Sequence, residues 1–329
     1  MRNLAFEEIM GATRGAVRFE RRDGYLHFHR FTPDEYTRYT PHDPEGLKKK
    51  MPSTSCVHIV FYTDSDRLFL KAHLSQASSR FFGDAIDLLV DGRLYRSFGH
   101  DGKAQSDIEL TVGLPFGEKK IALVLPGLFS ASIAALGIAE DATFISFFPK
   151  KKMLIYGDSI TQGYDAKTPS KSYANQLALA LDAHAVCKAI GGEVYYPHLA
   201  ELDTGVAAPD MITVAYGVND WHFGVSSEKE FCENARAFLS SLHERYPDAR
   251  LFVLSPLWCG DADRADPFPF RKIPEILAEA ISGIEGARVV DCFDFIPHDP
   301  AFFADGGLHP NDGGYDYYYK GLAEAGLLS

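Results

Sequence analysis

Short apolar or alternating runs, each broken by turn-forming residues, fill the first half of the chain. They lie at residues 56–62, 67–72, 86–90, 108–112 and 120–125. Runs of this length between turn signals are typical of antiparallel strands, and several in succession are typical of a sandwich. Helical periodicity is scarce in this half. The pattern therefore predicts an antiparallel, jelly-roll-like β-sandwich over residues 1–148.

After the lysine run at residues 150–152 the pattern changes to apolar strands that alternate with amphipathic helices. The predicted strands are 153–156, 185–189, 211–216, 251–255 and 289–292. Before the fourth strand, Ser227 and Glu230 form a capping box that opens a helix. Its apolar stripe is Phe231, Ala235, Phe238, Leu239 and Leu242. Strands that are apolar on both faces, with helices between them, predict an α/β domain with a covered parallel sheet over residues 149–329.

The composition of the chain limits the kinds of molecule that we expect it to bind. The 329 residues leave room for two domains, and 33 basic against 45 acidic side chains give a net charge of −12. An acidic chain without a long basic block does not favour nucleic acid or an anionic membrane as its partner. The first residues carry acids where a signal peptide needs an apolar core, and no run reaches the ~18 apolar residues of a membrane span. We expect a cytoplasmic protein, unless a signal has been removed, with a small-molecule or oligosaccharide substrate. The oligomeric state stays open, and a homo-oligomer is compatible with the sequence.

Neither the cysteines nor the histidines indicate a metal or a disulfide framework. The five cysteines are odd in number and contain no CxxC pair, so we interpret them as reduced, mostly buried thiols. His198, His222 and His298 are candidates to join His309 at a metal, but none has a second histidine or cysteine at helical spacing. We therefore predict no metal and no cofactor.

Polar residues follow the first three strands of the predicted parallel sheet, where active sites of such sheets gather. Residues 157–161 (Gly-Asp-Ser-Ile-Thr) leave Ser159 on a tight turn, which on its own is typical of a helix N-cap. Gly191 and Gly192 follow the second strand, and Asn219 follows the third. Each of these alone is explained by an ordinary turn. Near the end of the chain, Asp305 and His309 follow the last strand, so the sheet would bring the whole set to one edge.

In this order, the four blocks resemble the conserved blocks of the SGNH hydrolases, also called the GDSL esterase/lipase superfamily. The resemblance covers residues from about 152 to 325 and implies a flavodoxin-like three-layer α/β/α fold. An N-terminal sandwich before that fold is similar to the arrangement in some two-domain carbohydrate esterases. The resemblance further implies Ser159 as nucleophile and His309 as general acid and base. The implied oxyanion hole consists of the N–H groups of Ser159 and Gly192 and the side-chain amide of Asn219.

The acid that orients His309 departs from the family pattern. The family places this Asp three residues before the His, whereas position 306 is Gly and Asp305 lies four residues before. We expect the flexible Gly306-Gly307 pair to bulge and keep the Asp305 carboxylate on the ring, as in a serine-protease triad. Asp299 or a backbone carbonyl is the alternative.

The resemblance implies a serine carboxylester hydrolase, and we expect it to remove short acyl groups, above all O-acetyl groups on carbohydrate. The alternative is an acyltransferase or thioesterase that uses the same acyl-enzyme. A carbohydrate-binding module with a dead site is the alternative from a different class. Trp221 and Trp258 lie near the predicted active edge, where they either line the acyl or sugar pocket or belong to the core.

Overall fold

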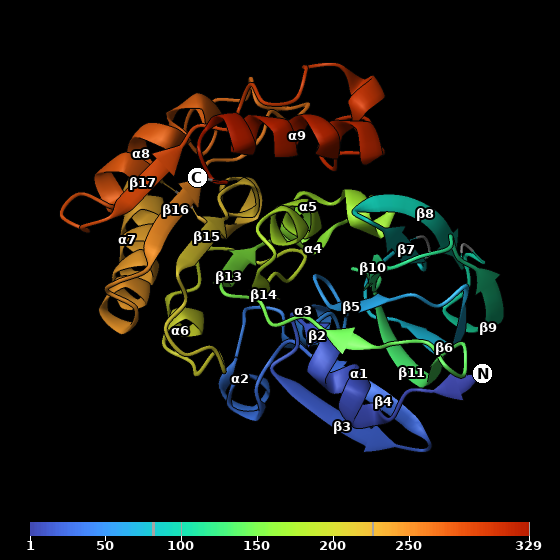
Figure 1. Cartoon of the computed structure of the whole chain (residues 1–329). Coiled ribbons are helices and arrows are strands. Elements are labelled where there is room, and N and C mark those ends of the chain that lie inside the picture. Colours follow the sequence, from blue (N-terminus) through green and yellow to red (C-terminus); the bar gives the residue numbers. More distant parts are fainter. Residues whose placement is uncertain (81–82, 100, 226, 329) are drawn as a thin grey trace.

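The computed structural model describes residues 1–80, 83–99, 101–225 and 227–328 (Figure 1). Its first half contains two antiparallel sheets with the strand orders β3-β4-β11-β6-β9 and β12-β5-β10-β7-β8, to which β1 and β2 add at β11 and β5. The bounds are β1 Arg2–Asn3, β2 Thr13–Arg14, β3 Arg18–Arg22, β4 Tyr25–His29, β5 His58–Thr63, β6 Arg67–Gln76, β7 Ile86–Val90, β8 Arg93–Phe98, β9 Gln105–Gly113, β10 Lys119–Val124, β11 Phe129–Ile138 and β12 Ile145–Ser146.

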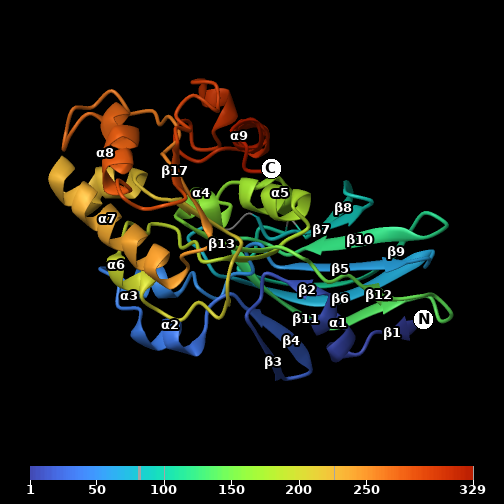
Figure 2. The same cartoon turned by 60° about the vertical axis from the view of Figure 1, so that its left-hand side comes forward.

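The two sheets stack face to face and enclose one apolar core (Figure 2). On β6, for example, Leu68, Leu70 and Leu74 are buried while the residues between Leu68 and Leu70 and on either side of Leu74 are not. This alternation is that of a strand with one face on a core. The predicted β-sandwich is therefore confirmed, and the five predicted strands appear as β5, β6, β7, β9 and β10.

The second half carries a parallel sheet with the strand order β14-β13-β15-β16-β17. Its strands are β13 Lys152–Gly157, β14 His184–Cys187, β15 Met211–Ala215, β16 Arg250–Leu254 and β17 Ala287–Val290. In chain order this is the 2-1-3-4-5 arrangement of flavodoxin-like folds, whose ligands bind at the carboxyl ends of the strands near the order reversal. The sequence prediction of this fold class is confirmed.

Helices cover both faces of the parallel sheet (Figures 1 and 2). Helices α7 and α8 pack on one face, and α5 and α9 pack on the other. The helices of this half are α4 Ser159–Gln162, α5 Tyr173–Ala180, α6 Pro197–Ala200, α7 Glu228–Arg245, α8 Ile273–Ala280 and α9 Asp312–Glu324, with single turns η1 Pro169–Lys171, η2 Asp220–Gly224, η3 Phe270–Lys272 and η4 Pro300–Phe302. The Ser227 hydroxyl accepts the N–H of Glu230 (3.3 Å), as the capping pattern predicts. Among the described residues, no helix has the length and apolar character needed to cross a bilayer.

Three short helices complete the first half: α1 Phe6–Ala12, α2 Pro33–Arg38 and α3 Pro44–Lys48. The segment that holds α2 and α3 does not pack into the sandwich. Phe31, Tyr39 and Leu47 belong instead to the core beneath α7 that also contains Tyr156 and Trp221. The antiparallel sheets end at residue 146 and the parallel sheet begins at residue 152, but the first half of the chain contributes to both cores.

Buried charges join this segment to β14. Lys188 Nζ lies 2.6 Å from Glu35 Oε2, and both side chains are fully buried. Arg30, also fully buried, donates to the backbone carbonyls of Ser53 (2.7 Å), Cys187 and Ala189 (3.2 Å). Burial lowers the pKa of Lys188 to about 8, and burial raises the pKa of Glu35, which its contact with Lys188 opposes. These contacts tie the first half of the chain to the end of β14 and the residues after it.

We predict that Lys188→Met lowers the free energy of unfolding by about 3–5 kcal/mol, because it leaves the Glu35 carboxylate buried without its cation. The double variant Lys188→Met/Glu35→Gln should recover most of that loss. Urea unfolding of the full chain measures both values. A loss below about 1 kcal/mol in the single variant would show that the pair does not hold the halves together.

Candidate active site

Ser159 lies on the tight turn between β13 and α4. The Asp158 carboxylate caps α4 by accepting the N–H of Ile160 (3.0 Å), which fixes the turn at the residues on either side of the serine. Ser159, Asn219 and His309 are each 8 % exposed, so the three side chains are buried but reachable.

A chain of hydrogen bonds connects Ser159 to an acid. Oγ of Ser159 lies 2.8 Å from Nε2 of His309, and Nδ1 of His309 lies 2.6 Å from Oδ2 of Asp305. The second carboxylate oxygen of Asp305 accepts the backbone N–H groups of Leu308 (2.9 Å) and His309 (3.0 Å). Gly306 adopts a φ of +86°, and this turn lets an acid four residues away reach the ring. Asp299, the alternative acid, instead accepts the N–H of Ala301 at the start of η4.

The Asp305 carboxylate is held in its charged form. Burial acts to raise its pKa, but the hydrogen bonds from the His309 ring and from the backbone outweigh this and lower the pKa well below its ordinary value. A charged acceptor at Nδ1 keeps the proton on that nitrogen. Nε2 of His309 is then free to accept the proton of the Ser159 hydroxyl.

Hydrogen-bond donors lie on the two neighbouring loops. The N–H of Ile190 donates to the carbonyl of Gly157 (3.0 Å), which attaches the loop after β14 to the turn that carries Ser159. Two residues on, Gly192 has a φ of +91°, and its N–H has no hydrogen-bond partner within the described part of the chain. The Asn219 amide donates one hydrogen to the carbonyl of Glu193 (3.0 Å), and the NH₂ group has a second hydrogen to offer. The structure thus keeps these donors beside the loop that adjoins Ser159.

The model of the GDSL-like Lipase/Acylhydrolase family matches residues 155–317, which include each of these groups. Residues 155–317 belong to this family, that of the SGNH hydrolases. Its catalytic domain is that of an SGNH-type esterase.

Solved structures share the fold over nearly the whole chain. A salicylyl-acyltransferase from a tetracycline biosynthetic pathway is 24% identical with a TM-score of 0.80, and the alignment covers 95% of this chain and 94% of that one. A putative GDSL-like lipase from Bacteroides ovatus is 21% identical with a TM-score of 0.75, covering 98% and 96%. A family two carbohydrate esterase from Clostridium thermocellum, in complex with cellohexaose, is 18% identical with a TM-score of 0.62, covering 92% and 97%. Because all three structures are less than 25% identical in sequence to this chain, their likeness is evidence for the fold alone. No curated protein matches the sequence.

Two buried acids support the loops that carry Gly192 and Asn219. Glu193 accepts the Tyr39 hydroxyl from the first half of the chain and the N–H of Val194 (3.0 Å). Asp220 accepts the N–H of Tyr195 (2.9 Å). Burial raises the pKa of Glu193 to about 8 and that of Asp220 to about 7. Both acids hold the loops that carry Gly192 and Asn219.

The first half of the chain also packs against the groups that surround the histidine. The Tyr164 ring, which packs in the sandwich core, stacks on the His309 ring with 5.5 Å between centroids. Arg80, which follows β6, forms an ion pair with Asp165, whose carboxylate lies 3.7 Å from Nδ1 of His309. The sequence patterns did not reveal Arg80 or Asp165. The only signal was that Asp165 closely follows the Gly-Asp-Ser block.

The structure distinguishes the two alternatives that the sequence left open for the tryptophans. Trp221 is fully buried, and its indole N–H donates to the carbonyl of Phe268 (2.7 Å), so it belongs to the core and offers no surface to a substrate. Trp258 is half-buried, stacks on His298 and makes an edge-to-face contact with Phe303. Phe303 forms an isolated antiparallel β-bridge with Pro310, the residue after His309. Trp258 therefore lies near the rim of the site. His198 pairs with Glu201 (2.9 Å) and His222 with Asp261 (3.1 Å), away from His309.

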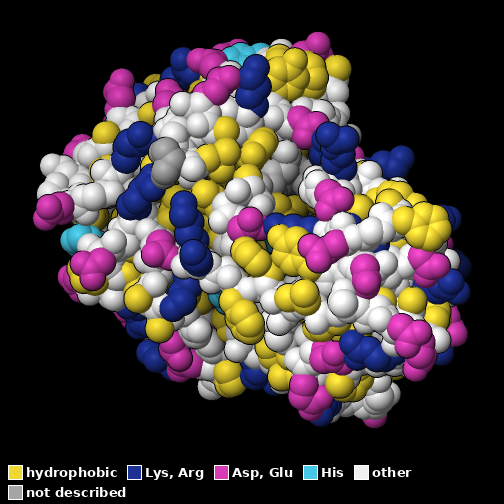
Figure 3. Space-filling model, in the orientation of Figure 1, with side chains coloured by type: hydrophobic (Ala, Val, Ile, Leu, Met, Phe, Trp, Pro, Cys, Tyr) yellow, Lys and Arg dark blue, Asp and Glu magenta, His cyan; other side chains and the backbone are white. Residues whose placement is uncertain are grey.

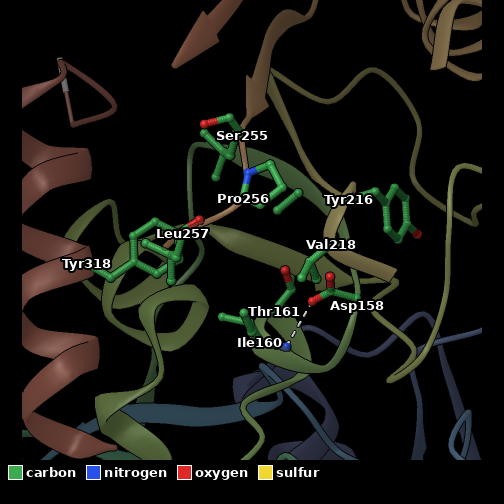
Figure 4. Close-up of a pocket in the computed structure, with 11 residues that line it drawn as sticks. Asp158, Ile160, Thr161, Tyr216, Val218, Ser255, Pro256, Leu257 and Tyr318 are labelled. Carbon is green, nitrogen blue, oxygen red and sulfur yellow. Dashed lines mark hydrogen bonds between the residues drawn. The ribbon is translucent and has the colours of Figure 1, made fainter. Parts of the chain in front are cut away.

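A small pocket lies between the turn that carries Ser159 and the loop that carries Asn219 (Figure 4). Its volume is about 20 Å³, which is room for one water-sized group. Ile160 and Val218, the chain neighbours of Ser159 and Asn219, line it together with Pro256 and Leu257. The pocket is therefore bounded by the direct neighbours of two predicted site residues.

We predict that Glu193→Gln flattens the dependence of stability on pH. A carboxyl whose pKa is raised to about 8 on folding contributes stability that is full below about pH 4.5 and is lost as pH rises towards 8. The neutral amide of Glu193→Gln should remove the stability loss that Glu193 causes as pH rises, whereas Asp220 should still cause a smaller loss. Urea midpoints at pH 5 and pH 8.5 measure the effect, with the exposed Glu244→Gln as control. Parallel pH curves for Glu193→Gln and the natural protein would contradict the assignment.

Proposed function

We propose that this chain is a serine carboxylester hydrolase that removes short acyl groups, above all O-acetyl groups, from carbohydrate through an acyl-enzyme on Ser159. The observation that carries the proposal is the continuous hydrogen-bond chain from Ser159 through His309 to Asp305, at 2.8 and 2.6 Å. A reachable alcohol in contact with an imidazole that is oriented by a carboxylate is the arrangement that activates a serine.

In the first half-reaction, Oγ of Ser159 attacks the ester carbonyl while Nε2 of His309 takes its proton. The N–H groups of Ser159 and Gly192 and the Asn219 amide donate to the oxyanion. The tetrahedral species then collapses, the C–O bond to the alcohol breaks, and His309 returns the proton to the leaving alcohol. Water attacks the acyl-enzyme by the same steps, which releases the carboxylic acid and restores the Ser159 hydroxyl.

The small size of the pocket that adjoins the Ser159 turn, which Ile160 and Val218 line but Ser159 itself does not, supports a short acyl group. A space of about 20 Å³ accepts a methyl group, whereas a long acyl chain needs a much larger apolar volume. The acyl methyl would lie between Ile160 and Val218, with Leu257 closing the far side.

Two features support carbohydrate as the alcohol. Trp258 is half-buried near the rim of the site and, although His298 stacks on one face of its ring, its exposed part is an aromatic surface of the kind that suits the apolar faces of sugar rings. On the face seen in Figure 3, acidic and basic side chains are interspersed, which suits a neutral substrate better than a polyanion. The likeness in fold to a carbohydrate esterase agrees with this choice.

An acyltransferase is the second candidate, because the structure with a TM-score of 0.80 is a salicylyl-acyltransferase. The same acyl-enzyme would then pass its acyl group to an alcohol other than water. The two functions differ in how the acyl-enzyme partitions between water and an added acceptor alcohol.

We predict that Ser159→Ala abolishes ester hydrolysis and labelling by a fluorophosphonate, because both need the activated hydroxyl. Ser241→Ala, on the surface of α7, serves as the matched control and should keep both. Mass spectrometry locates the label, and circular dichroism checks the fold. A Ser159→Ala variant with most of its activity would rule out the serine mechanism, and an unlabelled natural protein would indicate a dead site.

We predict a preference for acetyl over longer acyl groups that Leu257→Ala relaxes. Removing the Leu257 side chain enlarges the pocket, so the ratio of kcat/KM for acetyl and butyryl esters should fall by roughly tenfold. Leu242→Ala on α7 controls for the general cost of a core cavity. Acetate release from acetylated xylo-oligosaccharides tests the alcohol. Faster hydrolysis of long-chain esters by the natural protein would contradict the proposal.

A further inference from the structure

The catalytic histidine faces two carboxylates. Besides Asp305 at 2.6 Å, Asp165 Oδ2 lies 3.7 Å from Nδ1 of His309, too far for a hydrogen bond but close enough to attract a proton on that nitrogen. The Asp165 side chain is only 2 % exposed, and its backbone lies in the left-handed region at φ +63°. Such a conformation in a residue other than glycine persists only where the surroundings hold it.

Arg80 is the partner of this second acid. Its Nε lies 3.2 Å from one Asp165 carboxylate oxygen and its Nη2 lies 3.4 Å from the other, a two-pronged contact that suits the guanidinium fork. The same Nη2 lies 4.0 Å from Asp305 Oδ2. One carboxylate oxygen each of Asp165 and Asp305 and a ring nitrogen of His309 lie within 4.8 Å of one another, and the Arg80 guanidinium supplies the positive charge at this cluster.

The loop that carries Arg80 is built to hold it there. The carbonyl of Arg80 accepts the side-chain amide of Gln76 (2.9 Å) and the hydroxyl of Ser78 (3.1 Å), and its N–H donates back to that hydroxyl (3.1 Å). On the other side, the Tyr315 hydroxyl donates to the carbonyl of Tyr164 (2.8 Å), next to Asp165. Both members of the ion pair are therefore fixed through their backbones.

We propose that Arg80, supplied by the N-terminal sandwich, is a positioning residue for the catalytic histidine: it holds Asp165 and balances its charge, so that Asp305 alone orients His309. The proposal rests on the proposed function of Ser159 and His309. It gives the first half of the chain a part in the chemistry, because the sandwich supplies the cation that the site requires.

Charge balance explains why the cation matters. A histidine between two unbalanced carboxylates holds its proton too tightly, and it is a poor base at neutral pH and a poor donor to the leaving alcohol. Three other groups act on the His309 ring. Tyr164 stacks on it, Ser159 is its hydrogen-bond partner at Nε2, and Asp158, the residue before Ser159, interacts with it electrostatically. Burial raises the pKa of Asp165, against the opposing effects of His309 and Arg80, as expected for an acid that depends on these two partners. Within the described residues, Arg80 is the cation in this group.

The test compares Arg80→Gln, Arg80→Lys and the double variant Arg80→Gln/Asp165→Asn. The Arg80 side chain is 34 % exposed, so its replacement leaves the core intact. For Arg80→Gln we expect a loss of about tenfold in kcat with little change in KM, and an acid limb of the pH–rate profile that moves to higher pH. The kcat and the acid limb of Arg80→Lys should lie between those of the natural protein and those of Arg80→Gln, because one ammonium cannot make the two-pronged contact. The double variant should return the acid limb to its natural position.

The matched control is Arg67→Gln, which removes a similar exposed ion pair with Asp66 at the start of β6. It should change neither kcat nor the position of the acid limb.

Two outcomes would overturn the proposal: an Arg80→Gln variant with the natural kcat and acid limb, or a shifted limb that the double variant does not restore. A loss of folded protein with an unchanged pH profile would show a structural role only. NMR titration of the His309 ring in the natural protein and in Arg80→Gln tests the charge balance without any substrate. An upward shift of the midpoint supports the proposal, and an unmoved midpoint refutes it. A natural protein that neither hydrolyses esters nor reacts with a fluorophosphonate would refute the proposed function, and the titration would still decide the role of Arg80.

Discussion

The contact between His309 and Ser159 is the constraint on which the rest of the site depends, because it joins loops that are 150 residues apart in the sequence. Helix α9 makes this contact possible. The buried hydroxyl of Tyr315, in its first turn, shares its one hydrogen between the carbonyls of Tyr164 (2.8 Å) and Ile160 (3.0 Å) and so ties the helix that follows His309 to the segment that begins at Ser159. The parallel sheet supplies the other half of the geometry, since the strands before Ser159, Gly192 and Asn219 lie side by side and end at the same edge.

The sequence was informative wherever a local pattern decides the structure. Alternating and apolar runs located most strands, and four polar blocks in a fixed order indicated the site. It was uninformative for β11, the central strand of its sheet, because this strand is rich in alanine and serine and contains a glycine, none of which favours a strand. The order of the strands within each sheet also depends on long-range pairing, which leaves no periodic trace.

The remaining differences concern residues whose role is set by partners far away in the sequence. Trp221 follows Asn219 by two residues, and the turn η2 directs its side chain into the core, where Phe268 accepts its N–H. Arg80 and Asp165 are 85 residues apart, and no spacing rule links them. Tyr39, which reaches Glu193, is likewise recognisable only in three dimensions. The first half of the chain thus touches the site from two directions, although its sequence shows no catalytic pattern.

The fully buried contacts of Arg30 and Glu35 with β14 have a consequence for the order in which the chain folds during synthesis. Both charged side chains leave the ribosome more than 150 residues before Cys187 and Lys188, their partners on the strand and just after it. Until then the segment that carries α2 has no place to bury its charges, so it must remain in water while the sandwich strands pair. The sandwich can form early, whereas this segment can dock only after the first two parallel strands have been made. Its docking is therefore a late step that makes the two halves of the chain one structure.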